Sequence, residues 1–340
     1  MAQPQNHTIS LFRFGGPDEL HVADAPLPRA GPGEVRVRVL ASSINYTETL
    51  IRRHLYPQTA ALRVPFVMGY DVIGDIDQLG EGVEGFKIGD RVADMTVVGS
   101  NASYRTLRAD DLTLVPDGVD PAEASTLILS WMTAYQLIHR SARAKPGQRV
   151  LVHGAAGAVG QALLVLCGLA GLHVWGAANS RHSNLVCELG AMPVEYDRED
   201  FTKAVPGGFD VVFDGIGEDG YRRSFAALKR GGILIAIGYS AAVQAKQGML
   251  RMLACIARLY LWRWLPGGRR ARFYSINVMR ARHPDWFKQD LALLFGLLDD
   301  GMIHPHVAER IPFEGVPDAH RRLEEGGLEG KIVLCPELVA

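Results

Sequence analysis

The sequence predicts an α/β protein in which a doubly wound, parallel-sheet domain is combined with a mostly β domain. Two observations predict this fold class. Residues 34–115 contain short alternating or β-branched runs that Gly and Pro separate, which is typical of a mostly β domain with irregular loops. From about Asp120 onward, apolar strands alternate with helical segments, and this alternation indicates parallel βαβ units with right-handed crossovers.

Length and composition fit a two-domain protein of ordinary surface charge. A chain of 340 residues is too long for one compact core and suits two domains. Its formal net charge of −1 gives no general attraction for nucleic acid. The four cysteines form neither a CxxC pair nor a disulfide pattern, so we interpret them as small buried hydrophobic residues in a reducing compartment. Residues 1–10 show no secretory signal, and we expect a cytoplasmic protein.

The elements of the mostly β part are short. Strands are expected at residues 34–40, 72–76, 90–92 and 113–115. A helix is expected at 122–141, and Lys145-Pro146-Gly147 marks a turn after it.

The elements of the doubly wound part follow in alternation. Strands are expected at 150–152, 173–177, 193–196, 210–213 and 233–237, with helices at 161–169, 184–189 and 221–228 between them. The C-terminal part carries an expected helix at 286–298 and a strand at 331–334. We therefore predict a mostly β domain at 1–120, a nucleotide-binding domain at 121–268, and a return to the first domain at 269–340.

A small-residue turn, His153-Gly154-Ala155-Ala156-Gly157-Ala158-Val159-Gly160, joins the first of these strands to a helix. Gly157 lets the backbone approach a pyrophosphate, and Gly160 lets the helix lie close to its strand. The unpaired amides at the start of the helix then face the anion. The candidate phosphate-binding residues are Ala156, Gly157, Ala158 and Val159.

The end of the second strand indicates which dinucleotide would bind. In dinucleotide-binding domains an acidic residue at this strand end binds the ribose diol of NAD, and a basic group suits NADP. Here the strand runs into Asn179, Ser180 and Arg181, with no carboxylate. Ser180 can donate a hydrogen bond to a 2′-phosphate and Arg181 a bidentate pair, although the same residues would also make a polar cap for the next helix. We predict NADPH rather than NADH.

Three further residues are candidates for cofactor contact because they end strands of the parallel sheet. They are Tyr196 at the end of the third strand, Gly215 after the fourth and Gly238 after the fifth. Either glycine could instead serve only as a turn between strand and loop.

Ordered motifs along nearly the whole chain resemble the medium-chain dehydrogenase/reductase superfamily, and specifically its zinc-free quinone oxidoreductase branch, which includes zeta-crystallin-like and VAT-1-like proteins. The motifs are the segments 41–49 (ASSINYTET), 68–74 (MGYDVIG), 86–92 (FKIGDRV), 155–160 (AAGAVG) and 330–333 (GKIV). The resemblance implies a Rossmann NADPH-binding domain, a GroES-like catalytic domain and a cofactor contact at Lys331 in the closing motif.

The resemblance also implies that the protein holds no metal. Zinc alcohol dehydrogenases of this superfamily have a cysteine where this chain has Asn45 and a histidine where it has Tyr70. Neither substitute belongs to the thiolate, imidazole and carboxylate set that Zn²⁺ prefers. Without a Lewis acid, oxidation of simple alcohols becomes difficult, whereas reduction of an electron-poor acceptor stays open.

The expected reaction is hydride transfer from NADPH to a quinone or to the β-carbon of an α,β-unsaturated carbonyl compound. The resemblance places Asn45, Glu48 and Tyr56 near the nicotinamide and the acceptor, and the Tyr56 phenol could supply a hydrogen bond or a proton. The alternatives are a turn residue for Asn45, a solvated helix face for Glu48 and a packing aromatic for Tyr56.

A long basic span departs most from the family pattern. No acidic residue occurs between Asp219 and Asp285, where thirteen Lys and Arg residues occur. Within this span, residues 249–265 are apolar but interrupted by arginine, and they are too short and too charged to cross a bilayer. We expect this segment to fold over the substrate cleft and pack in a homodimer interface with its arginines outward. Contact with anionic lipid is not favoured, because the arginines do not fall on one helical face.

Two functions from different classes follow. The first is an NADPH-dependent, zinc-independent reductase, expected as a homodimer, that acts on a bulky apolar acceptor. The alternative is an NADPH-binding sensor, or a protein that associates with a membrane or partner, with little catalytic activity. An enoyl reductase module of the polyketide type shares the scaffold, but a chain without carrier-domain neighbours disfavours it.

Overall fold

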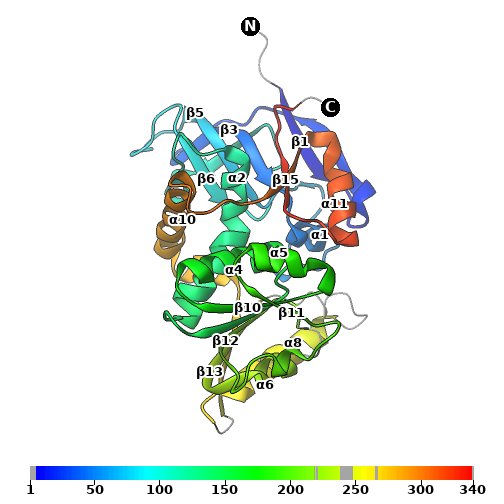
Figure 1. The fold of residues 1–340 in the computed structure, drawn as a ribbon. Helices are drawn as coiled ribbons and strands as arrows, with labels where there is room; N and C mark the ends of the chain where they lie inside the picture. Colours follow the sequence, from blue (N-terminus) through cyan, green and yellow to red (C-terminus); the bar gives the residue numbers. More distant parts are fainter. Residues whose placement is uncertain (1–4, 218, 220, 238–247, 265–266, 339–340) are drawn as a thin grey trace. The chain divides into compact units, whose positions relative to one another are not determined.

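The computed structural model describes residues 5–217, 219, 221–237, 248–264 and 267–338. The chain divides into two compact units (Figure 1). Unit 1 consists of Met1–Leu129 and Lys288–Ala340, and unit 2 consists of Ser130–Phe287.

Unit 2 contains a parallel sheet that matches the predicted fold class. Its strands are β9 (Arg149–His153), β10 (His173–Ala178), β11 (Met192–Glu195), β12 (Phe209–Asp214), β13 (Leu228–Ile237) and β14 (Arg270–Tyr274). They lie in the order β11-β10-β9-β12-β13-β14, and every pairing between them is parallel. This is the doubly wound order, in which the direction of winding reverses between β9 and β12.

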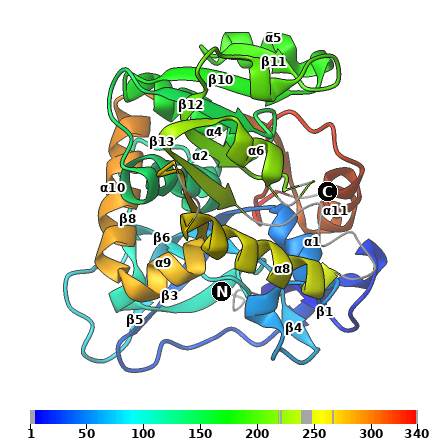
Figure 2. The same cartoon turned by 90° about the horizontal axis from the view of Figure 1, so that it is seen from below.

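The helices of unit 2 connect these strands and cover both faces of the sheet. They are α3 (Met132–Gln136), α4 (Ala158–Leu169), α5 (Ser183–Glu188), α6 (Arg222–Ala226), α8 (Gly248–Leu261) and α9 (Ile276–Arg282). Figures 1 and 2 show α4 and α5 on one face and α6 and α8 on the other. The strands are continuous apolar runs because both faces are covered: Val150, Leu151, Val212 and Leu234 are fully buried.

Unit 1 is mostly β, as predicted. Its strands are β1 (Asn6–Leu11), β2 (Leu20–Ala25), β3 (Glu34–Ser43), β4 (Phe66–Val67), β5 (Asp71–Leu79), β6 (Arg91–Met95), β7 (Tyr104–Arg108), β8 (Thr113–Leu114), β15 (Val307–Ile311) and β16 (Lys331–Leu334). One sheet has the order β2-β1-β4, and the larger one has the order β15-β16-β3-β5-β6-β8 with β7 also paired to β3. β3 alternates buried and half-buried residues along most of its length, as expected for a strand with one face on a core.

The helices of unit 1 include α1 (Tyr46–Arg52), α2 (Pro121–Thr126) and α11 (Val316–Glu325), and α10 (Pro284–Asp299) begins just before the second boundary of the units. Asp120 caps α2, because its carboxylate accepts the Glu123 N–H at 3.0 Å. The C-terminal segment rejoins this unit through β16, which pairs antiparallel to β3 with Val333 opposite Ser43.

The boundaries of the units differ from the predicted ones at 120/121 and 268/269. The unit boundary falls after Leu129, because α2 packs on β3 and β5 of unit 1. The second boundary falls after Phe287, because residues 270–274, which we had assigned to the C-terminal return, form β14 and pair parallel to β13. The alternation of arginine with Ala, Phe and Tyr in this strand did not resemble the apolar strands beside it.

The basic, apolar segment predicted at 249–265 forms most of α8 and a 3₁₀ turn at Trp262–Trp264, while Leu265 lies outside the described residues. Cys255 and Leu259 are buried in the core of unit 2, and Trp262 stacks on Phe225 with ring centroids 4.3 Å apart. In contrast, Tyr260, Leu261 and Trp264 are 63%, 66% and 82% exposed. Among the described residues, none of the helices is long and apolar enough to cross a membrane.

Candidate functional site

The glycine turn of unit 2 lies at the switch point of the sheet. β9 ends at His153, Gly154 adopts a left-handed φ of 90°, and α4 begins at Ala158 with Gly157 at its N-cap position. The Gly157 N–H donates to the Gly154 carbonyl, and the Ala156 carbonyl accepts the Gln161 side chain at 2.7 Å. These bonds close the turn, and the N–H groups of Gly154 and Ala155 attach it to the Ala177 carbonyl of β10.

The turn fits the phosphate groups of a dinucleotide. The first amides of a helix have no carbonyl partner within the helix, and here no side chain caps them. Gly157 is exposed, and a Cβ on it would meet only the Gly154 carbonyl oxygen, at 3.5 Å. Ala156, Ala158 and Val159 are half-buried beside it. The predicted phosphate-binding residues thus share one accessible turn.

Gly160 has a different role from Gly157. A Cβ at Gly160 would lie 2.2 Å from the Gly154 carbonyl oxygen and 2.7 Å from the Ala155 Cα, so no side chain fits there. This is the close packing of helix against strand that the sequence pattern predicts for the last glycine.

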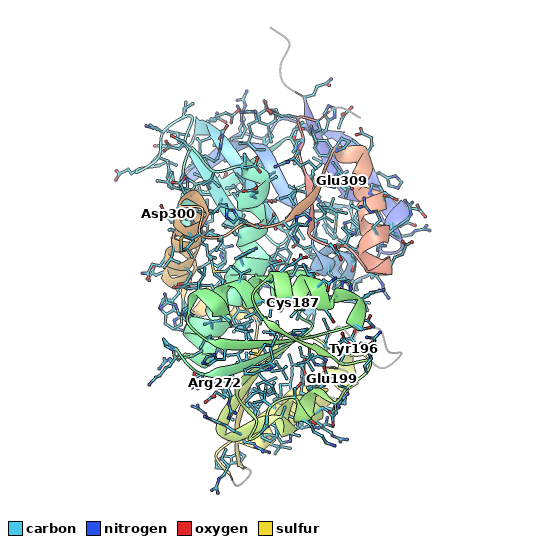
Figure 3. The ribbon with its side chains drawn as sticks, viewed as in Figure 1. Cys187, Tyr196, Glu199, Arg272, Asp300 and Glu309 are labelled. Carbon is cyan, nitrogen blue, oxygen red and sulfur yellow. The ribbon has the colours of Figure 1, made fainter. Side chains whose placement is uncertain are left out.

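The carboxyl ends of β9, β11 and β12 bring together polar and aromatic side chains. His153 Nδ1 lies 3.3 Å from an oxygen of Asp214, and the His153 ring packs against Phe201 and Tyr196 with centroids 4.8 and 6.1 Å apart. Tyr196, labelled in Figure 3, is 43% exposed. Asp214 fixes the next loop, because it accepts the N–H groups of Ile216 and Gly217.

The residues predicted to bind the 2′-phosphate follow β10 but are engaged within the chain. Ser180 donates both its N–H and its hydroxyl to the Asp197 carboxylate, each at 2.8 Å. Asn179 accepts the Arg181 N–H at 3.2 Å, and the exposed Arg181 donates its Nε–H to His182 at 3.0 Å. Asp197 is the residue that our reading of the sequence missed. Its position two residues after β11 was the available signal, since adjacent parallel strands end at the same edge.

One of the two glycine candidates at later strand ends lies beside the glycine turn. Gly215 follows β12, and its N–H donates to the His153 carbonyl at 3.3 Å, so it lies beside the turn at the switch point. Gly238 lies outside the described residues.

Unit 1 holds a buried polar cluster around Asn45, which comprises Ser43, Asn45, Glu48, Asp71, Asn101 and Lys331. The Asn45 amide nitrogen donates to the Asp71 carboxylate and the Ser43 carbonyl, each at 2.8 Å, and its oxygen accepts the Lys331 ammonium. Lys331 also donates to the Ile44 carbonyl at 3.1 Å. Asn45 is only 2% exposed, so its amide is committed to these internal partners.

Glu48 belongs to the same cluster. It is fully buried, accepts the Asn45 N–H at 2.9 Å at the start of α1, and accepts the Asn101 amide at 3.2 Å. The structure therefore does not place Glu48 on a solvated helix face, which was the alternative reading. Its carboxyl group holds the N-terminal turn of α1 in place.

Burial controls the protonation of this cluster. It raises the pKa of Glu48 to about 8, and the nearby Asp71 acts in the same direction. Burial also raises the pKa of Asp71, against the opposing effects of Lys331 and Ser43, and lowers the pKa of Lys331 despite both carboxyl groups. At neutral pH Glu48 is therefore largely protonated.

Two tyrosines that lie near these residues in the sequence contact each other. The Tyr56 and Tyr70 hydroxyl oxygens lie 3.0 Å apart, with their rings in an edge-on arrangement. Tyr70 is fully buried and immediately precedes Asp71, whereas Tyr56 is half-buried. Tyr70 thus holds the phenol of a more accessible tyrosine.

Of the predicted catalytic residues, Asn45 and Glu48 come together and Tyr56 pairs with Tyr70. Lys331, predicted as a cofactor contact, donates to Asn45. The roles of these four residues stay predictions, and the hydrogen bonds of Asn45, Glu48 and Lys331 show that these three side chains position one another. Within the described ranges, no group of three or more His, Cys, Asp and Glu residues is arranged to hold a metal ion.

Comparisons with known proteins give the family. Residues 31–117 match the alcohol dehydrogenase GroES-like domain, and residues 189–334 match the zinc-binding dehydrogenase domain. The quinone oxidoreductase of Rattus norvegicus is 30% identical over 96% of both chains. The synaptic vesicle membrane protein VAT-1 homolog of the same species is 29% identical, over 98% of this chain and 85% of that protein.

A solved structure agrees with these relatives. A mycobacterial protein in complex with NADPH superposes with a TM-score of 0.82 at 28% identity, over 97% of this chain and 100% of that one. The chain therefore belongs to the medium-chain dehydrogenase/reductase superfamily of nicotinamide-dependent oxidoreductases, in the zinc-free branch that contains the quinone oxidoreductases and VAT-1.

Proposed function

We propose that the protein is an NADPH-dependent, zinc-independent reductase of quinones or α,β-unsaturated carbonyl compounds. The observation that carries this proposal is the open glycine turn at the switch point of unit 2, where uncapped helix amides fit a dinucleotide pyrophosphate. The relatives support the class of acceptor, since one of them is a quinone oxidoreductase.

Residues of unit 2 would bind the coenzyme. The amides of Gly157, Ala158 and Val159 would hold the pyrophosphate, and Tyr196 offers an exposed aromatic ring at the same edge of the sheet. Arg181 is exposed and has guanidinium donors beyond its bond to His182 that would suit a 2′-phosphate, which favours NADPH. The NADPH complex of the mycobacterial protein supports the same choice.

Residues of unit 1 would serve the acceptor. The bound coenzyme would supply a hydride, and the reduced acceptor then needs a proton on its oxygen. The Tyr56 phenol, held by Tyr70, would donate a hydrogen bond or that proton. Asn45, Glu48 and Lys331 would keep the segment before α1 rigid through their buried bonds.

The test is NADPH oxidation with a panel of quinones and enones, with coenzyme binding measured separately. We expect turnover of at least one apolar quinone, a preference for NADPH over NADH, and a fall in kcat of about tenfold or more for Tyr56→Phe with coenzyme affinity unchanged. Binding of NADPH without turnover of any acceptor would overturn the proposed reductase function and favour the alternative, an NADPH-binding sensor.

We also propose that the protein is a homodimer. β14 is the last strand of its sheet, and among the described residues no strand pairs with its outer edge. The exposed Tyr260, Leu261 and Trp264 lie at the end of α8, the helix that packs on β14. An open strand edge beside exposed aromatic residues is a surface that a second copy would cover.

A further inference from the structure

Ser180, at the end of β10, already binds a carboxylate of the protein itself where the coenzyme phosphate is expected. Asp197 accepts the Ser180 N–H at one oxygen and the Ser180 hydroxyl at the other, both at 2.8 Å. The register of β10 and β11, with Ala178 opposite Glu195, brings the two segments to the same edge. Asp197 therefore binds both donors that Ser180 can offer.

A 2′-phosphate would need the same donors. Its oxygens accept hydrogen bonds as a carboxylate does, so a 2′-phosphate and the Asp197 carboxylate would compete for the two Ser180 donors. Of the neighbouring cations, Arg198 pairs with Glu195 at 3.0 Å and also lowers the pKa of Asp197 through its charge, and Arg181 donates to His182. A phosphate that reaches Ser180 must displace the Asp197 carboxylate.

The proposed function gives this arrangement a consequence, on which the following inference rests. We infer that Asp197 is a specificity-determining residue, which competes with the 2′-phosphate for Ser180 and lowers the preference for NADPH over NADH that Ser180 and Arg181 would otherwise give. NADH lacks the 2′-phosphate and does not need to displace the Asp197 carboxylate. Its affinity therefore depends on other contacts.

The charge of Asp197 supports the competition. Although burial acts in the opposite direction, the hydrogen bonds from Ser180 lower the pKa of Asp197, so the carboxylate is ionised at neutral pH. It repels a phosphate group as well as occupying its donors.

The decisive variant is Asp197→Asn, which keeps the size of the side chain and removes its charge. The probes are 2′,5′-ADP and 5′-AMP, which differ only in the 2′-phosphate, and their dissociation constants are measured by calorimetry on the full chain. We expect Asp197→Asn to bind 2′,5′-ADP roughly fivefold to tenfold more tightly and 5′-AMP within about twofold of the original protein. The ratio of the NADPH and NADH dissociation constants should shift in the same direction.

Glu199→Gln is the matched control. It removes one negative charge two residues away, but Glu199 accepts the Glu195 N–H rather than Ser180. Its ratio of the two dissociation constants should stay within about twofold of the original protein. Adding Ser180→Ala to Asp197→Asn should remove most of the gain for 2′,5′-ADP.

The outcomes separate this inference from the proposed function. An unchanged ratio in Asp197→Asn, with both probes bound, overturns the inference and leaves the coenzyme site intact. Weaker 5′-AMP binding in that variant also overturns it, because Asp197 would then be a ligand of the ribose diol. Failure of both probes, NADPH and NADH to bind any variant overturns the proposed function together with the inference.

Discussion

Gly157 and Gly160 stand in one turn but meet different limits. A methyl group on Gly160 would collide with backbone atoms of Gly154 and Ala155, whereas a methyl group on Gly157 has room in the structure as it stands. Gly157 also has an ordinary φ of −76°, which alanine adopts without strain. Packing within the fold restricts Gly160 to glycine. At Gly157 the restriction would come from the bound coenzyme.

Alanine at each position should separate these limits. Gly160→Ala should lower the free energy of unfolding by about 1–3 kcal/mol, because the added methyl group overpacks the junction of α4 and β9. Gly157→Ala should keep the original stability and weaken NADPH binding by at least about tenfold, because its methyl group lies where the pyrophosphate approaches. Urea unfolding and a coenzyme titration measure the two effects, and equal loss of stability in both variants would contradict the division.

Glu48 should make the stability of the protein depend on pH. Its folded pKa of about 8 lies above its ordinary value of 4.5, so the stability it contributes is complete below pH 4.5 and is lost as the pH rises toward 8. Glu48→Gln cannot ionise. Its free energy of unfolding relative to the original protein should therefore rise by about 2–4 kcal/mol between pH 5 and pH 8.

The exposed Glu84→Gln provides the control for that experiment, and its curve should run parallel to that of the original protein. Parallel curves for Glu48→Gln as well would show that Glu48 ionises without cost, contrary to its burial. Unfolding in urea at several pH values is sufficient for both variants.

At this scale the sequence indicated candidate residues but not their partners. Asn45 and Glu48 could be singled out because they lie in the motif at 41–49, and Tyr56 because the resemblance places a tyrosine there. Their partners could not, because Lys331 is 286 residues from Asn45 and Asp197 is 17 from Ser180, and no local pattern records such contacts. The reading of Ser180 as an open donor was incomplete for this reason.

The contact of α1 with α11 contains a buried histidine whose ring makes no hydrogen bond within the described part of the chain. Arg52 of α1 is fully buried, bonds the Gly15 carbonyl and pairs with Glu324 of α11 at 2.5 Å. His320 of α11 is also fully buried, and neither of its ring nitrogens has a hydrogen-bond partner among the described residues. Burial, with the charge of Arg52, lowers the pKa of His320 to about 3.

This helix contact should be sensitive to acid. The folded pKa of His320 lies below the ordinary 6.5, so its contribution is complete above pH 6.5 and is lost as the pH falls toward 3. His320→Leu should keep the stability at pH 7 or raise it by about 1 kcal/mol, and should lose about 2 kcal/mol less than the original protein between pH 7 and pH 5. The exposed His304→Leu is the control. A large loss of stability in His320→Leu at pH 7 would instead show that the ring makes a necessary bond.

Elements with a clear apolar period were predictable from the sequence, and those without one were not. β9, β10, β12 and β13 are buried on both faces and therefore read as apolar runs. β14 lies at the edge, where Arg270 and Arg272 are exposed, and its mixed sequence concealed it. Figure 3 labels Arg272 on this strand.

The proposed homodimer is a prediction about the whole molecule. Light scattering after gel filtration should give a mass of about twice 37.1 kDa. Trp264→Glu should shift the protein toward the monomer, because it places a charge in the surface that the second copy covers, whereas the exposed Phe12→Glu of unit 1 should not. If the original protein is a monomer and floats with anionic vesicles, the homodimer is contradicted. The exposed surface would then bind a membrane, with the basic span attracting anionic lipid.

The fold class was the most predictable property at this scale, and the limits of the units were less so. Strands that alternate with helices permit few topologies, so the doubly wound sheet followed from the pattern. The boundaries at Leu129 and Phe287 depend on which sheet α2 and β14 join, and packing partners rather than local sequence determine that.

The insertion of unit 2 within unit 1 also sets an order of assembly during synthesis. All six described strands of the parallel sheet lie between Arg149 and Tyr274, so that sheet can close while the ribosome still holds the C-terminal segment. The pairing of β3 with β16 can form only after the C-terminal segment is made. The same holds for the bond from the Lys331 ammonium to Asn45. A nascent chain can therefore complete its glycine turn before the polar cluster around Asn45 has its final member.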